Sequence, residues 1–295
     1  MIEQKNRPLL ASLWVLGALL LFSMMAISAR ELGSRHEVFE ILAYRSMIGF
    51  AFICAIALFF KKQNEISFAR IKGHALRNGI HFTGQSLWFV AVMQIPLAQV
   101  FALEFTAPIW VILLAPFMLG EAFTKLKLFA AFLGFIGIWI VAQPDFSNPS
   151  PGVFAAASCA VFFALTVIFT KRLTRYEGLL SIMFWLTGFQ ALFGLILSLR
   201  DGAMVLPDLQ SFPWLVVIAI CGLGGHFCLT KALSLAPASF VGPIDFLRLP
   251  LIAFVGAAVY QEPVTSSLVL GAGLILLANF LTIRAASRGT NATLK

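Results

Sequence analysis

The chain has 295 residues, of which 60% are hydrophobic and 12% are charged, and its mean hydropathy is +0.93. So little polar surface cannot cover a water-soluble globule, and the composition therefore predicts an integral membrane protein. The formal net charge of +8 does not indicate a nucleic-acid partner, because the basic residues lie in short loops between apolar runs and form no polar face.

Apolar runs long enough for a helix to cross the bilayer follow one another along the chain. The first run follows Lys5 and Arg7 as a signal peptide would, but its 22 residues exceed a signal core and predict a retained helix. Short junctions with prolines at Pro96 and Pro237 predict tight helical hairpins. The predicted helices cover residues 8–29, 38–60, 74–94, 97–119, 127–143, 151–171, 178–199, 211–234, 238–260 and 266–285.

The loop charges predict the orientation of these ten helices. If the N-terminus is cytoplasmic, fifteen Lys and Arg residues fall on the inner side and only Arg30, Arg35 and Arg200 on the outer side. The remaining three basic residues, Arg45, Lys231 and Arg248, lie within helices, which accounts for all 21. This excess predicts a bacterial-type inner-membrane protein with both termini in the cytoplasm.

The second half of the chain repeats the first at a spacing of 141 residues. Five helices per copy is an odd number, so the second copy must enter the membrane from the opposite side. The fold class expected is therefore an all-α membrane protein with two inverted five-helix repeats, at 1–147 and 148–295. Residues related by this spacing include Pro96 and Pro237, Glu104 and Asp245, Glu121 and Glu262, Gly84 and Gly225, and Tyr44 and Trp185.

This duplicated pattern, with Gly120-Glu121 and Gln261-Glu262-Pro263 ending the fourth and ninth helices, resembles the two EamA units of the drug/metabolite transporter superfamily. FEILAYRSMIGF at 39–50 and HALRNGIHFTGQSLWFVAV at 74–92 resemble the subgroup of bacterial carriers for amino acids and larger organic metabolites. The resemblance implies a ten-helix carrier of organic solutes. It also implies that the carrier exports its substrate. The alternative is proton-coupled or exchange-type uptake of a larger metabolite such as S-adenosylmethionine or riboflavin.

Charged residues inside the helices are the leading candidates for the transport site, because each costs about 2.5–3.5 kcal/mol at mid-bilayer unless it is compensated. Glu104 and Asp245 are expected either to bind substrate or protons, or to form structural ion pairs. Arg45 lies at a depth similar to Glu104 and is expected either to clamp a substrate carboxylate or to pair with Glu104. Arg248, three residues after Asp245, can neutralise that acid along one helix face.

A polar and aromatic stripe marks the third helix, where His81, Gln85 and Trp88 share one face. His226 is the repeat partner of Gln85. These side chains are expected either to line a cavity or to hold helices together. Two further candidates are Trp110, which can stack on a planar substrate, and the hinge prolines Pro108 and Pro250, which permit bends.

The sequence favours a secondary transporter that exports a small organic metabolite, an amino acid or a related zwitterionic or aromatic compound, across the inner membrane by alternating access. No nucleophile, catalytic base or metal motif typical of a membrane enzyme occurs, and the four cysteines have no metal-ligand spacing, so no enzyme, metal or cofactor is expected. A channel or a structural membrane protein is the alternative of a different class. The expected partners are a small-molecule substrate, the lipid bilayer and, as open alternatives, protons and a second copy in a homodimer.

Overall fold

The computed structural model describes residues 8–33, 35–119, 125–143, 150–173, 176–200, 202, 204–235 and 247–292. Within these residues the chain is helical and contains no strand, which confirms the predicted all-α class. The helices are α1 (Pro8–Leu32), α2 (Val38–Phe59), η1 (Gln63–Glu65), α3 (Ile71–Gln94), α4 (Leu97–Glu104), α5 (Ala107–Leu119), α6 (Lys125–Ala142), α7 (Pro151–Leu173), α8 (Leu179–Ser198), α9 (Phe212–Leu235), α11 (Arg248–Tyr260) and α12 (Ser266–Ala292).

The observed helices agree with the predicted spans within a few residues, with three exceptions. The helix α12 ends at Ala292 and not at residue 285. The predicted helix 97–119 is two helices, α4 and α5, because the chain makes a turn at Phe105 and Thr106. The predicted helix 238–260 is described only from Arg248, so its first half lies outside the described residues.

Five described helices, α1, α2, α7, α8 and α9, are each long and apolar enough to cross a membrane. The helix α3 has 24 residues but is not among them, because it carries His74, Arg77, Asn78, His81 and Gln85. All five of these polar side chains are buried, so they face neighbouring helices and not lipid. The polar face of α3 therefore points into the bundle.

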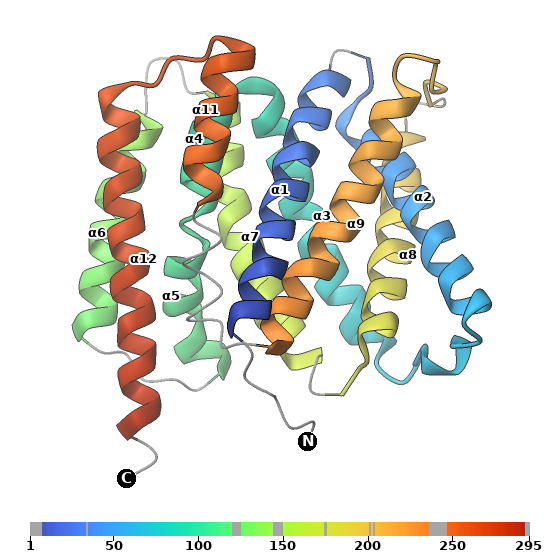
Figure 1. Ribbon diagram of the computed structural model, residues 1–295, viewed down its shortest axis with the longest axis horizontal. Coiled ribbons are helices and arrows are strands. Elements are labelled where there is room, and N and C mark those ends of the chain that lie inside the picture. The colour runs from blue at the N-terminus through green and yellow to red at the C-terminus, as the bar shows by residue number, and fades with distance from the viewer. Residues whose placement is uncertain are drawn as a thin grey trace.

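Helix pairing follows a twofold pattern. The main pairs are α1 with α9, α3 with α7, α2 with α8, and α6 with α12. The counterparts of α1 and α3 in the second repeat are α7 and α9, so the pair α1–α9 corresponds to the pair α7–α3. The pairs α2–α8 and α6–α12 each join a helix to its own counterpart. Figure 1 shows α6 and α12 at one edge of the bundle, and α2 and α8 toward the opposite edge.

Contacts at the helix ends show that the two repeats are inverted. The start of α4 lies at the end of α11, where the Leu97 N–H donates to Glu262 Oε2 at 2.8 Å. The start of α7 lies at the end of α3, since a Cβ on Gly152 would be only 2.9 Å from Gln94 Cβ. Thus α7 begins at the face where α3 ends, and the start of α1 and the end of α12 lie at one end of the bundle (Figure 1).

Two equivalent hydrogen bonds fasten the long loops to the bundle. Tyr44 on α2 donates its hydroxyl to the Val205 carbonyl at 2.9 Å, and Trp185 on α8 donates its indole N–H to the Ser67 carbonyl at 2.8 Å. Tyr44 and Trp185 are 141 residues apart. The repeat therefore preserves a loop contact although the residue types differ.

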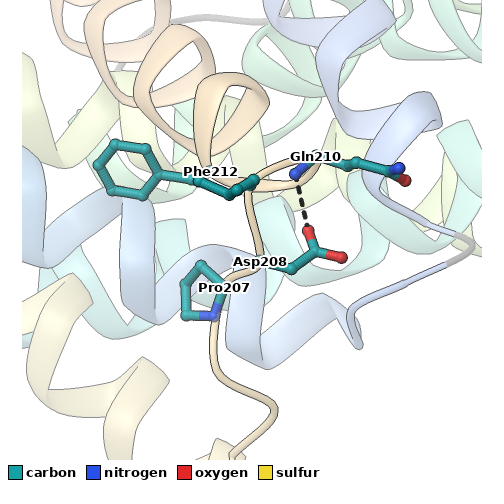
Figure 2. Close-up of a pocket in the computed structure, with 5 residues that line it drawn as sticks. Pro207, Asp208, Gln210 and Phe212 are labelled. Atoms are coloured by element: carbon teal, nitrogen blue, oxygen red, sulfur yellow. Dashed lines mark hydrogen bonds between the residues drawn. The ribbon is translucent and has the colours of Figure 1, made fainter.

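The pockets that stand out lie at the ends of the bundle. One surrounds the turn before α9 and is lined by residues 207–210 and Phe212 (Figure 2). There Asp208 Oδ1 accepts the N–H groups of Gln210 at 3.1 Å and Ser211 at 2.6 Å, so the turn caps the helix. The other pocket lies between the start of α3 and the end of α7. Glu104 lines neither pocket. The candidate site is therefore identified from the charge of Glu104 and the residues that it contacts.

Candidate functional site

Glu104 is the last residue of α4, at the break between α4 and α5. Pro108 has no N–H, so it cannot donate the helical hydrogen bond that the Glu104 carbonyl would normally accept. The break is stabilised by its neighbours: Thr106 Oγ1 donates to the Leu103 carbonyl at 2.7 Å, and Asn279 Nδ2 of α12 donates to the Phe105 carbonyl at 2.6 Å. The Leu103 and Phe105 carbonyls at the break are thus satisfied by protein groups.

The Glu104 carboxylate connects three helices. Its Oε2 accepts the indole N–H of Trp88 on α3 at 2.8 Å, and its Oε1 lies 3.4 Å from Arg248 Nη2 on α11. The side chains of Glu104 and Arg248 are 14% and 8% exposed. The pair therefore joins α4 of the first repeat to α11 of the second, in a largely buried setting where removing either partner would leave a buried charge.

The Arg248 guanidinium also lies over three phenylalanine rings. Its Cζ is 5.2 Å from the ring centre of Phe22, 5.1 Å from that of Phe101 and 5.2 Å from that of Phe105. These distances are within the range of cation–π attraction. The rings exclude water from the guanidinium, which strengthens its attraction to Glu104.

Arg45 does not pair with Glu104; its hydrogen-bond partners lie elsewhere. With its amide oxygen turned toward α2, Gln85 accepts from Arg45 Nη1 at 3.3 Å and Nη2 at 3.1 Å, and its amide nitrogen donates to Gln190 Oε1 at 2.7 Å. The Arg45 guanidinium also lies 5.7 Å from the Phe89 ring centre. Of the two expected roles for Arg45, pairing with Glu104 is wrong, and clamping an anionic group stays a prediction.

His81 and His226 lie against each other between the two repeats. Their ring centres are 5.3 Å apart in an edge-to-face arrangement. Phe163 of α7 contacts His81 and Phe22 of α1 contacts His226, at centre distances of 6.0 and 5.2 Å. His81 is buried and neither of its ring nitrogens has a hydrogen-bond partner. The predicted stripe of α3 thus lies inside the bundle next to its repeat counterpart.

Three polar residues near this stripe are not among the predicted site residues: Arg77, Asn78 and Gln190. The count of inner loop charges includes Arg77, but it is buried in α3 and donates from Nε to Thr170 Oγ1 at 3.0 Å and from Nη1 to Asn78 Oδ1 at 2.7 Å. Arg77 lies one turn before His81 on the same helix face, and this position could have identified it as a site residue from the sequence. Nothing in the sequence distinguishes Asn78 and Gln190, since a lone amide in a helix is common.

The remaining predicted residues do not join this cluster in the described structure. Trp110 packs on Phe135 of α6, with ring centres 5.2 Å apart, and its indole nitrogen is buried without a partner. Pro250 is an exposed residue in the first turn of α11, where proline is compatible with a helix. Asp245 lies outside the described residues.

Comparisons with known proteins agree with this architecture. The EamA-like transporter family matches residues 9–143 and 150–284. The riboflavin transporter of Brucella anthropi is 32% identical over 75% of this chain and 78% of its own. The S-adenosylmethionine uptake transporter of Rickettsia prowazekii is 24% identical over 92% of this chain and 91% of its own. A solved crystal structure matches 94% of this chain and 98% of its own, with a TM-score of 0.65 and 19% sequence identity. This match supports the fold alone.

Proposed function

Because this chain belongs to the EamA-like transporter family, we propose that it is a secondary transporter that moves a small organic metabolite across the inner membrane by alternating access. Both repeats of the family are matched, and the pairing of helices is symmetric between them. Inverted repeats support alternating access, because each repeat can adopt the arrangement of the other and so open the site to the opposite side.

The observation that carries this proposal is the Glu104–Arg248 pair. Each partner comes from a short helix, α4 or α11, and the two helices belong to opposite repeats. An ion pair between repeats is stable only while the repeats are close, so a change in their relative position must break or exchange it. Substrate or a proton that takes the place of Arg248 at Glu104 would lower the free energy of that exchange.

For the substrate we propose an aromatic or zwitterionic metabolite of the size of riboflavin or S-adenosylmethionine. The supporting observations are the substrates after which the relatives are named and the aromatic side chains near Glu104, namely Trp88, Phe101 and Phe105. A flat heteroaromatic ring can stack on such side chains. The relatives named as uptake transporters favour uptake over export, which family likeness alone had favoured.

The test is counterflow of radiolabelled riboflavin and S-adenosylmethionine in proteoliposomes. The wild-type protein should give saturable counterflow of at least one compound, and Glu104→Gln should reduce its rate at least about tenfold, as expected when one buried charged contact is lost. Glu65→Gln, an exposed glutamate in the loop before α3, is the control and should retain the rate. Flux without saturation would indicate a channel, and an unchanged rate, Km and pH dependence in Glu104→Gln would exclude the proposed role of Glu104.

For the orientation we propose cytoplasmic termini, on the basis of the loop charges. The loop containing Glu65 is then cytoplasmic, and the loop containing Leu209, which is almost fully exposed, is external. In a background without the native cysteines, an impermeant thiol reagent added to intact cells should label Leu209→Cys and not Glu65→Cys. The reverse labelling would mean the opposite orientation.

A further inference from the structure

Two arginines of the bundle are buried without a carboxylate. Arg45 contacts Gln85, Met25 and the Phe89 ring, and Arg77 contacts Thr170 and Asn78. No carboxylate in the described part of the chain lies within ion-pair distance of either guanidinium. Removing an unpaired charge from water costs several kcal/mol, so buried guanidiniums are usually paired with an anion.

The two arginines belong to one polar network. Arg77, His81 and Gln85 lie four residues apart on one face of α3, and Gln85 accepts from Arg45. Gln190 of α8 completes the connection, because it accepts from Gln85 at 2.7 Å and donates to the Asn78 carbonyl at 3.5 Å. The network therefore presents two fixed positive charges that are held by neutral hydrogen-bond partners.

His81 lies between these charges and has unused hydrogen-bonding capacity. It is 3% exposed, neither ring nitrogen has a partner, and the charges of Arg77 and Arg45 both act on it. A buried imidazole without partners is uncommon, since buried polar groups are normally hydrogen-bonded. An anionic group placed beside His81 could accept from its ring N–H and would be attracted by the positive charges of Arg77 and Arg45.

We infer that Arg45, Arg77 and His81 form an anion subsite that binds the carboxylate or phosphate group of the transported metabolite. This inference rests on the proposed transport function and names the chemistry that its site selects. Carboxylate and phosphate groups both present negatively charged oxygens in a planar or tetrahedral arrangement. Two such oxygens can accept from the paired N–H donors of an arginine guanidinium. The Glu104–Arg248 pair combines a positive and a negative charge, whereas no carboxylate among the described residues pairs with Arg45 or Arg77.

The spacing along α3 shows how one substrate can reach both regions. Trp88, the donor to Glu104, is three residues after Gln85, the acceptor from Arg45, or about 4.5 Å along the helix axis. A zwitterion can therefore place its cationic end toward Glu104 and its anionic end toward Arg45. Both ends would contact the same face of α3.

The test compares ligands that differ only in the anionic group. The carboxylate pair is S-adenosylmethionine and its decarboxylated form, and the phosphate pair is flavin mononucleotide and riboflavin. Binding to the purified protein is measured by thermal shift and by tryptophan fluorescence. In at least one pair, the anionic member should bind at least about tenfold more tightly than its partner, as expected for a charge-assisted contact. Equal binding within both pairs, or no binding of either anionic ligand, would overturn the inference.

Two variants test whether a preference for the anionic ligand depends on the subsite residues. Gln85→Glu places a carboxylate where Arg45 now donates, so it should keep the protein folded and reduce the preference below about threefold by occupying Arg45 internally. Arg45→Lys keeps the charge but loses the forked donors, and it should reduce the preference in part. The exposed Arg35→Lys is the matched control and should leave the preference unchanged.

The outcomes separate this inference from the proposed function. An anion preference that persists unchanged in Gln85→Glu would exclude the subsite, whatever the transport result. Counterflow of all four compounds, with equal affinity within both pairs, would retain the transport function and overturn only the subsite. A preference in binding that is lost in Gln85→Glu, without counterflow of any of the four compounds, would support the subsite and contradict transport of these compounds.

Discussion

Arg248 and Arg45 are both buried guanidiniums in the same bundle, but their surroundings differ. Arg248 lies beside the Glu104 carboxylate and three phenylalanine rings, whereas Arg45 has the neutral Gln85 amide, a methionine sulfur and one ring. The first arrangement neutralises its charge within the protein and the second does not. In the proposed mechanism, the first arginine would hold the repeats together until its pair is exchanged, and the second would be available to a ligand.

Among the variants proposed below, Arg248→Met should cause the largest loss of stability. This change keeps the side-chain volume but leaves Glu104 charged and buried, so it should lower the free energy of unfolding by about 3–5 kcal/mol. The measurement is denaturant or thermal unfolding of the purified protein in detergent. The control is Arg35→Met, which breaks the Arg35–Asp208 pair, where the side chains are 44% and 55% exposed, and should cost at most about 1 kcal/mol. Equal losses in the two variants would mean that Glu104 is not held by Arg248.

A smaller effect is expected from Trp88→Phe. The indole N–H donates to the Glu104 carboxylate at 2.8 Å, and a hydrogen bond to a charged group contributes about 1.5–3 kcal/mol. Unfolding of the variant in the same detergent measures that loss. Trp110→Phe is the matched control, because the Trp110 indole nitrogen has no partner, so it removes a similar ring portion without a hydrogen bond. If both variants lose the same stability, the Trp88 bond does not hold Glu104.

The smallest effect is expected from Arg45→Met. Loss of the hydrogen bonds to Gln85 is offset by removal of a buried charge that no described carboxylate neutralises, so stability should change by less than about 1 kcal/mol. The same unfolding measurement as for Arg248→Met makes the two arginines directly comparable. A loss as large as that of Arg248→Met would mean that Arg45 is compensated within the protein, and the contrast between the two regions would disappear.

The sequence predicted the helical class, the repeat and an acid at position 104 inside an apolar span, because these follow from the length of the apolar runs, the 141-residue spacing and the position of Glu104 in its run. It offered Arg45 as a partner of Glu104 and Arg248 as the partner of Asp245, and so it missed the pair between Glu104 and Arg248. Both lie within helices at plausible depths, and only the packing of α4 on α11 decides which guanidinium reaches the carboxylate.

Two other features depend on packing in the same way. A proline at position 108 is compatible with a bend or with a full break, and the observed break is supported by the distant Asn279 side chain. Arg77 lies close enough to a helix end that a count of loop charges includes it, although its side chain is buried against α7. Asp245, predicted as the counterpart of Glu104, stays a prediction.

The most direct measurement is counterflow by the double variant Glu104→Gln/Arg248→Met. Removing both charges together should restore much of the stability that Arg248→Met loses, because position 104 no longer carries a buried charge that lacks Arg248, and the amide oxygen introduced there can still accept from Trp88. If Glu104 takes part in transport, this stable protein should still transport at least about tenfold more slowly than wild type. A double variant that is stable and transports at the wild-type rate would show that the pair only locks the helices, which would contradict the proposed role.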